Sequence, residues 1–123
     1  MDKPNILICD DEEGVRESLR MILSGDYSLT FTKEGEEALN SLAVKAPELV
    51  IMDIKMPGMN GLEALKRIKH EKPGVPVMVI TGYESLNVAT EAVKSGTDDY
   101  LTKPFDRKKL SERVRVLLKK RDA

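Results

Sequence analysis

The chain has 123 residues, 41% of them hydrophobic, which is enough to bury one core and fits one domain over residues 1–123. Its 20 basic and 21 acidic residues leave a net charge of -1, so the composition gives no general attraction to nucleic acid or to an anionic membrane. No apolar run approaches the ~20 residues that span a bilayer, the start lacks a secretion-signal pattern, and one cysteine excludes an internal disulfide. The cytoplasm is therefore the expected compartment.

Apolar segments with the length of strands alternate along the chain with segments of helical periodicity. The predicted strands are 5–9, 27–32, 49–53, 75–80 and 99–103. The first predicted helix follows acidic residues 10–13, which complement a helix N-terminus, and it ends near Gly25. The other predicted helices are 36–44, 61–70, a segment that ends near Gly96, and a segment that begins after the N-cap Asp106.

Regular alternation of strands and helices predicts the fold class. It favours an α/β protein whose parallel sheet is covered on both faces by helices in right-handed crossovers. The predicted architecture is a (βα)5 flavodoxin-like doubly wound sheet, for which the usual strand order at this size is 2-1-3-4-5. Pro57-Gly58 and Asn60-Gly61 predict a loop after the third strand, at the sheet edge where such folds bind ligands.

Polar side chains stand at the carboxyl ends of four predicted strands. They are Asp10 and Asp11 after the first strand, Asp53 at the end of the third, Thr81 after the fourth, and Lys103 at the end of the fifth. The three carboxylates are expected to face one another across a small pocket, and such a cluster repels itself unless a cation lies within it. Oxygen ligands suit Mg²⁺, whereas one histidine and one cysteine are too few for a zinc site.

A carboxylate, a divalent cation, a lysine and a hydroxyl are the parts that phosphoryl transfer requires. In this interpretation Asp53 attacks in line, while Thr81 and Lys103 contact the phosphoryl oxygens. Each residue alone has an ordinary structural role, since a strand-end aspartate usually caps a turn and an isolated lysine is usually solvated. Their combination at four strand ends is what favours a functional site.

With these residues in view, the chain resembles the receiver domain of bacterial two-component response regulators, a CheY-like superfamily, from Ile6 to about Leu118. The motifs are Ile-Leu-Ile-Cys-Asp-Asp-Glu, Val-Ile-Met-Asp-Ile-Lys-Met-Pro-Gly-Met-Asn-Gly, Val-Ile-Thr-Gly and Gly-Thr-Asp-Asp-Tyr-Leu-Thr-Lys-Pro-Phe, in this order. The resemblance implies a signalling switch and not an enzyme, in which Asp53 accepts a phosphoryl group from a histidine kinase or phosphotransfer protein. The overall pattern resembles most the receivers of transcription activators.

The resemblance also implies a set of metal ligands. Mg²⁺ would be bound by Asp11 and Asp53, by Asp10 through water, and by the backbone carbonyl of Lys55. Asp53, Thr81 and Lys103 would then form the phosphoryl-binding group.

A conformational switch is implied as well, in which Tyr100 turns inward as Thr81 moves toward the phosphate. The Lys103-Pro104 bond is expected to be cis. The face built from the fourth helix, fifth strand and fifth helix would act on an output domain or a downstream protein, and it is a candidate homodimer interface. No direct contact of this domain with nucleic acid or with a membrane is expected.

The sequence departs from the family pattern at two positions, Gly82 and Thr97, where alanine is common in the family. Neither change removes a functional group, although a glycine at 82 could loosen the loop that must move. Lys55 and Tyr83 occupy positions that tune the phosphoryl lifetime in this family.

Two other classes of protein are alternatives. A small phosphohydrolase similar to the haloacid dehalogenases would also use Asp53 as nucleophile, but it requires a second aspartate where Lys55 stands. A passive flavodoxin-like binding module would require a glycine- or serine-rich loop after the first strand, where acidic residues 10–13 occur. The cognate kinase, and whether the chain is a stand-alone regulator or part of a longer one, stay open.

Overall fold

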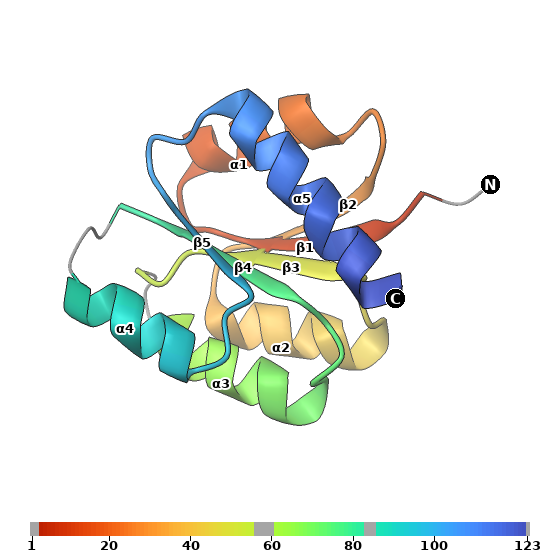
Figure 1. The fold of residues 1–123 in the computed structure, drawn as a ribbon. Helices are drawn as coiled ribbons and strands as arrows, with labels where there is room; N and C mark the ends of the chain where they lie inside the picture. Colours follow the sequence, from red (N-terminus) through yellow and green to blue (C-terminus); the bar gives the residue numbers. More distant parts are fainter. Residues whose placement is uncertain (1–2, 56–60, 83–85, 123) are drawn as a thin grey trace.

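The computed structural model describes residues 3–55, 61–82 and 86–122, in which strands and helices alternate from end to end. The strands are β1 Asn5–Cys9, β2 Ser28–Thr32, β3 Leu49–Met52, β4 Val77–Thr81 and β5 Asp99–Thr102. The helices are α1 Glu13–Leu23, α2 Gly35–Val44, α3 Gly61–Glu71, α4 Leu86–Lys94 and α5 Arg107–Asp122. One sheet lies between two helical layers, with α1 and α5 on one face and α2, α3 and α4 on the other (Figure 1).

The sheet confirms the predicted topology. All its strand pairings are parallel, and the order is β2-β1-β3-β4-β5. The order reverses between β1 and β3, which is the point where sheets of this kind open a crevice at their carboxyl ends. Cys9 pairs with Met52 in the register, and the N–H of Asp53 donates to the Cys9 carbonyl over 3.0 Å. Asp10 and Asp53 therefore leave the sheet side by side.

The core explains why the central strands have continuous apolar sequences. Every residue of β1, β3 and β4 is buried, as expected for strands covered by helices on both faces. On one face Leu39 of α2 and Leu65 of α3 pack in one cluster with Leu7 and Cys9 of β1. On the other face Leu19 of α1 and Leu110 of α5 pack with Ile6 and Ile8.

Strand boundaries differ slightly from the predicted ones. The predicted 75–80 strand begins instead at Val77 and continues to Thr81, because the N–H of Val75 is used in a turn to the Lys72 carbonyl, 3.0 Å away, and Pro76 has no N–H to donate. Asp53 and Lys103 lie just beyond β3 and β5 and not within them. The loop predicted at 57–60 lies outside the described residues, as does position 83.

Two local predictions for the segment that joins β5 to α5 are confirmed. The Lys103-Pro104 peptide bond is cis. Asp106 caps α5, since its Oδ1 accepts from the N–H of Lys108 at 2.8 Å and of Lys109 at 3.1 Å. Among the helices of the described ranges, none combines the length and the hydrophobicity that crossing a bilayer needs.

A substitution at Gly61 tests how closely this residue approaches the backbone that follows β3. A Cβ at this position would lie 2.4 Å from the Asp53 carbonyl oxygen and 2.4 Å from the Cα of Ile54. Because backbone atoms cannot move aside as the end of a flexible side chain can, Gly61→Ala is expected to lower the free energy of unfolding by about 1–3 kcal/mol. Urea denaturation followed by circular dichroism measures this change.

The matched control is Gly14→Ala in α1, where an added Cβ meets nothing within 4 Å. This substitution is expected to leave stability unchanged or to raise it by up to ~1 kcal/mol, since alanine favours helices. Equal unfolding free energies for the two variants would contradict the close approach at Gly61.

Candidate functional site

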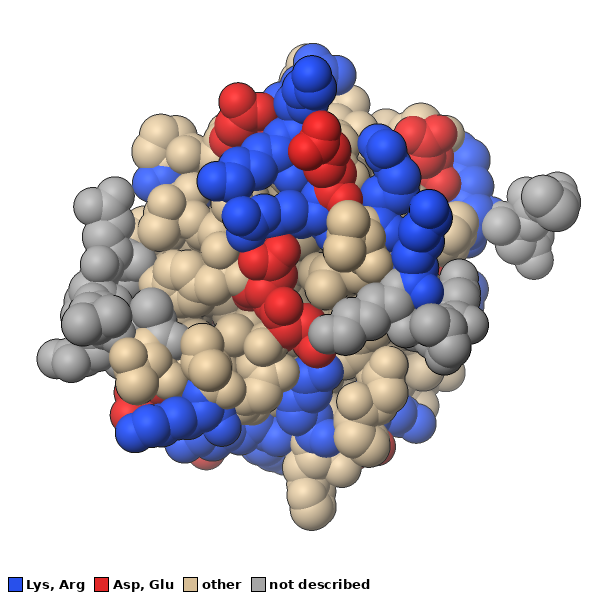
Figure 2. Space-filling view, viewed as in Figure 1, with Lys and Arg blue, Asp and Glu red and all other residues tan. Residues whose placement is uncertain are grey.

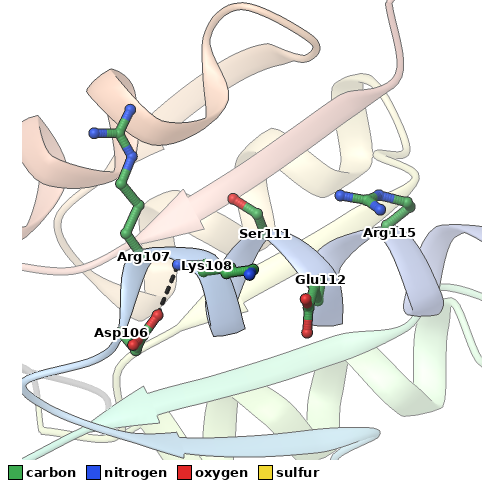
Figure 3. Close-up of a pocket in the computed structure, with 6 residues that line it drawn as sticks. All are labelled: Asp106, Arg107, Lys108, Ser111, Glu112 and Arg115. Atoms are coloured by element: carbon green, nitrogen blue, oxygen red, sulfur yellow. Dashed lines mark hydrogen bonds between the residues drawn. The ribbon is translucent and has the colours of Figure 1, made fainter.

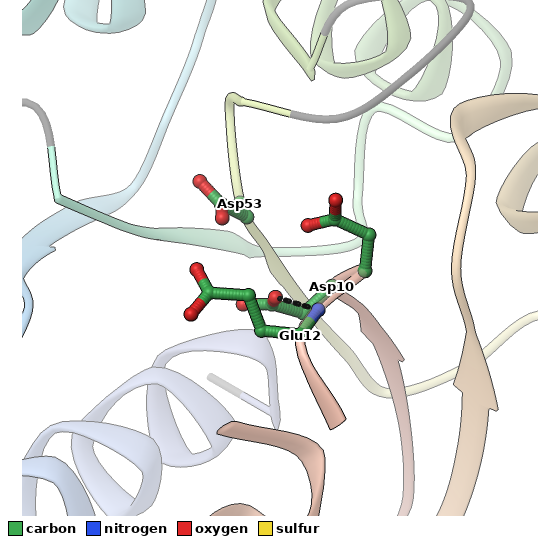
Figure 4. Close-up of side chains that lie close together, drawn as sticks. Asp10, Glu12 and Asp53 are labelled. Atoms are coloured by element: carbon green, nitrogen blue, oxygen red, sulfur yellow. Dashed lines mark hydrogen bonds between the residues drawn. The ribbon is translucent and has the colours of Figure 1, made fainter. Parts of the chain in front are cut away.

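Acidic side chains meet where β1 and β3 end. One carboxylate oxygen from each of Asp10, Asp11, Glu12 and Asp53 lies within 4.8 Å of the others. Asp10 and Asp53 are 2% and 3% exposed, whereas the other two residues are exposed to solvent. Figure 4 shows Asp10, Glu12 and Asp53 gathered at this edge of the sheet. The predicted proximity of the first and third strand ends is therefore observed.

The loops after β1 and β3 hold the two buried aspartates in the same way. Oδ1 of Asp10 accepts the N–H of Glu12 at 2.9 Å, and Oδ1 of Asp53 accepts the N–H of Lys55 at 3.0 Å. An aspartate commonly fixes a turn by accepting the N–H two residues later. Nη1 of Arg16 also donates to the Asp10 carbonyl over 2.9 Å, which ties this turn to α1. The Oδ1 atoms are thus held by the loops, and both Oδ2 atoms contact Lys103, which follows β5.

Lys103 connects these carboxylates from the end of β5. Its Nζ lies 2.8 Å from Oδ2 of Asp53, 2.9 Å from Oδ2 of Asp10 and 2.9 Å from Oε1 of Glu12. An ammonium group has one N–H for each of these acceptors. Burial opposes the charge of this side chain, but the hydrogen bonds to Asp53, Glu12 and Asp10 outweigh it and raise the pKa of Lys103 above its ordinary value. The lysine is therefore positively charged at neutral pH.

Burial is also the main influence on Asp10. It raises the pKa of the Asp10 carboxyl, and the negative charge of Asp53 adds to the effect, while the N–H of Glu12 and the ammonium of Lys103 oppose it. Even when Lys55 at the adjoining hollow is counted with Lys103, two ammonium groups stand against the carboxylates of four residues, so the site carries excess negative charge. A set of oxygen donors that is buried on one side and exposed on the other fits Mg²⁺, which keeps part of its water shell.

A hollow of about 220 Å³ adjoins the acidic cluster and is lined by Glu12, Asp53, Lys55, Thr81 and Gly82. Thr81 is the last residue of β4 and is fully buried. A larger hollow of about 630 Å³ lies over the first turns of α5, lined by the residues that Figure 3 labels, but none of them comes from a strand end. The smaller hollow is the one that Asp53 enters, so we assign the site there.

Tyr100 lies in β5 and packs, partly buried, against the core on the face of α2 and α3. Burial raises the pKa of its hydroxyl, and the negative charge of Asp53 raises it further. The predicted switch residue is therefore within electrostatic reach of the buried aspartate. Tyr83, predicted to tune the phosphoryl lifetime, lies outside the described residues.

Sequence reasoning missed two members of the site, Glu12 and Arg16. The sequence pattern indicated Glu12 only as part of an acidic helix start. In a tight turn, however, a glutamate two residues after Asp10 lies close enough to bind the same lysine as Asp10. Sequence reasoning also gave Lys103 only phosphoryl oxygens to contact, whereas the lysine here bonds to three carboxylates.

Comparison with known proteins identifies the class that this fold and site define. Residues 6–115 match the family model described as the response regulator receiver domain. The chain therefore belongs to the response regulator receiver domain family, as its motifs predict. Receiver domains are regulatory parts of two-component signalling proteins.

Relatives and solved structures agree with this assignment. The chain is 38% identical to the response regulator MprA of Mycolicibacterium vanbaalenii over 116 aligned residues. The aligned region covers 94% of this chain and 50% of MprA. It thus spans about half the length of the curated relatives it matches. It is also similar to the signal receiver domain of an HD domain-containing protein from Pseudomonas fluorescens, with 31% identity, a TM-score of 0.93 and 98% coverage of both chains. A receiver domain protein from Methanospirillum hungatei has 29% identity, a TM-score of 0.94 and the same coverage.

Removing the lysine tests how much the acidic cluster depends on it. Lys103→Met is expected to lower the free energy of unfolding at pH 7, without Mg²⁺, by about 2 kcal/mol, because buried carboxylates lose their counter-charge. Since the folded-state pKa of Lys103 is raised, its contribution is complete below the ordinary lysine pKa of about 10.4 and is lost as the pH rises through the folded-state value. Urea denaturation of both proteins from pH 7 to pH 10 measures the difference, which is expected to stay constant because the whole range lies below the ordinary lysine pKa.

Lys108→Met, on the exposed side of α5, is the matched control and is expected to change stability little at any pH in this range. A Lys103→Met protein as stable as this control at pH 7 would contradict the role given to the ammonium group.

Proposed function

We propose that the protein is a phospho-accepting switch of a two-component phosphorelay, in which Asp53 receives a phosphoryl group from a histidine kinase or a phosphotransfer protein. The observation that carries the proposal is the buried Asp53 carboxylate, held by the Lys55 N–H and by Lys103 Nζ at 2.8 Å, beside a hollow at the sheet edge. A carboxylate oxygen of Asp53 attacks phosphorus, the bond from phosphorus to the donor histidine breaks, and the imidazole keeps that electron pair.

Other residues of the site have complementary roles in this proposal. Lys103 and Thr81 donate hydrogen bonds to the phosphoryl oxygens. Asp10, Asp11 and Asp53, with the backbone carbonyl of Lys55, are the groups that would hold Mg²⁺. The metal, when bound, supplies positive charge that offsets the charge of the transferring group. The buried setting of Asp10 and Asp53 supports these roles, because oriented charges act more strongly where water is excluded.

A phosphoryl group would act as a switch by changing which arrangement of the loops is favoured. It adds about two negative charges, which Thr81 and Lys103 satisfy in one arrangement of their loops. Moving a two-state equilibrium from about 1:99 to about 99:1 requires about 5.5 kcal/mol of differential interaction. Two or three charge-assisted hydrogen bonds at roughly 1.5–3 kcal/mol each reach this value. In this proposal, the Tyr100 side chain turns inward once Thr81 has moved toward the phosphoryl group.

The output surface proposed here is the face of α4, β5 and α5. Lysine and arginine side chains gather over α5 in Figure 2, with acidic side chains among them. An ion pair already joins β5 and α5, since Nη1 of Arg113 lies 2.7 Å from Oδ1 of Asp99. The partner of this face is an output domain or a downstream protein, with regulation of transcription as the consequence, and a second copy of the chain is the proposed dimer partner.

Residues 1–123 would form a single receiver domain that acts in the cytoplasm. The long similarity to receiver domains supports this organisation. The domain would not itself turn over a substrate, beyond promoting its own phosphorylation and dephosphorylation. The curated relatives are about twice as long as this chain, so any activity of the whole protein is likewise part of the proposal.

Intact mass measurement after incubation with acetyl phosphate and Mg²⁺ tests the function. The wild type is expected to gain one phosphoryl group, because Asp53 is the nucleophile, and the gain should require Mg²⁺. Asp53→Asn is expected to gain none, since an amide is not a comparable nucleophile.

The exposed loop residue Asp26 gives a matched control, and Asp26→Asn is expected to be labelled like the wild type. Label on Asp53→Asn equal to that on Asp26→Asn would overturn the assignment of the acceptor. Beryllofluoride with Mg²⁺ detects a phosphoryl site whose adduct is too short-lived for mass measurement, and a wild type that shows neither label nor spectral change around Thr81 would overturn the function.

A further inference from the structure

Lys103 shares its ammonium group among three carboxylates, and one of them has no part in the proposed reaction. We propose that Glu12 is a positioning residue, which holds Lys103 over Asp53 while the other partners of the lysine are engaged elsewhere. This inference rests on the proposed function, because it concerns the same site.

The conformation of Glu12 shows that its side chain does not serve the local helix. Glu12 is the N-cap of α1, with φ -89° and ψ 116°, yet its side chain makes no capping hydrogen bond. Its Oε1 instead lies 2.9 Å from Nζ of Lys103, 91 residues away in sequence. The N–H of Glu12 donates to Oδ1 of Asp10, which fixes the backbone from which the side chain extends. The helix start therefore goes without a side-chain cap while the carboxylate reaches the lysine.

The other two partners of Lys103 have competing duties. A phosphoryl group on Asp53 occupies the space beside its carboxylate and takes a donor from the lysine. Asp10 belongs to the set that would hold Mg²⁺. Glu12 is exposed over 60% of its side chain and is not among the groups proposed above to hold Mg²⁺ or the phosphoryl oxygens, so its bond to Lys103 competes with neither role. It is thus the carboxylate that keeps the ammonium group in place during transfer.

Beryllofluoride binding, at saturating MgCl₂, tests the proposal without measuring turnover. The dissociation constant is taken from amide resonances of Thr81 and Gly82 in the wild type, Glu12→Gln, Glu12→Asp and Glu13→Gln. Glu13→Gln is the matched control, because this neighbour is also acidic, exposed and in the first turn of α1, but it lies outside the carboxylate cluster.

Both Glu12 variants are expected to bind beryllofluoride about three- to fivefold more weakly, the scale set by one exposed charged pair, while Glu13→Gln binds like the wild type. Glu12→Asp separates positioning of the lysine from an effect of net charge and from an effect of helix capping. It keeps the negative charge, but its side chain is one methylene shorter, so the 2.9 Å contact between Glu12 and Lys103 is expected to be lost, and aspartate is a preferred N-cap. Thermal unfolding should therefore show an unchanged or raised melting temperature together with weaker beryllofluoride binding.

Several results would overturn the proposal. If Glu12→Asp binds like the wild type and only Glu12→Gln is weakened, the effect is one of overall charge. If Glu13→Gln is weakened equally, the effect belongs to the first turn of α1 in general. Wild-type affinity in both Glu12 variants removes the role altogether. A wild type that shows no beryllofluoride-dependent shift instead overturns the proposed function itself, so the two failures are distinguishable.

Discussion

The contact between one ammonium group and the carboxylates around it is the interaction on which the site depends. Asp10 and Asp53 are almost fully buried, and two such groups repel each other in a low-dielectric environment. Lys103 makes their burial tolerable by bonding to the Oδ2 atom of each. The fold supplies this cation from β5, two strands away from β3 in the sheet order, by ending that strand at Thr102 and placing the next residue over the crevice.

The proposed switch requires a resting state that an added group can change, and the bonded Lys103 would be part of that state. The lysine is fully bonded at rest, so a new group on Asp53 must compete for its hydrogen bonds and not merely occupy an empty space. Thr81 and Tyr100 lie on the strands that flank the same edge, one fully buried and one partly buried. In the proposed switch, a change in charge at Asp53 would therefore act on both β4 and β5, which lead into the proposed output face.

Much of this structure is predictable from local patterns. Continuous apolar runs identify β1, β3 and β4 because these strands are buried on both faces, and the residue that follows each run marks the site edge. Strand ends are less predictable, since the start of β4 depends on how Val75 and Pro76 use their backbone groups. Glu12 was missed because its role depends on a partner 91 residues away, and no local period or propensity reports such a contact.

The spacing of the site residues along the chain also has a consequence for synthesis. A nascent chain that has emerged only through β4 carries Asp10 and Asp53 but not yet Lys103. Pairing β1 with β3 at that stage would bring the two carboxylates together without Lys103, and like charges placed so close repel each other. Docking of β5 then contributes electrostatic neutralisation as well as packing. Of the five strands described, β5 is synthesised last, so the carboxylates at the ends of β1 and β3 gain their ammonium partner only when the whole sheet is present.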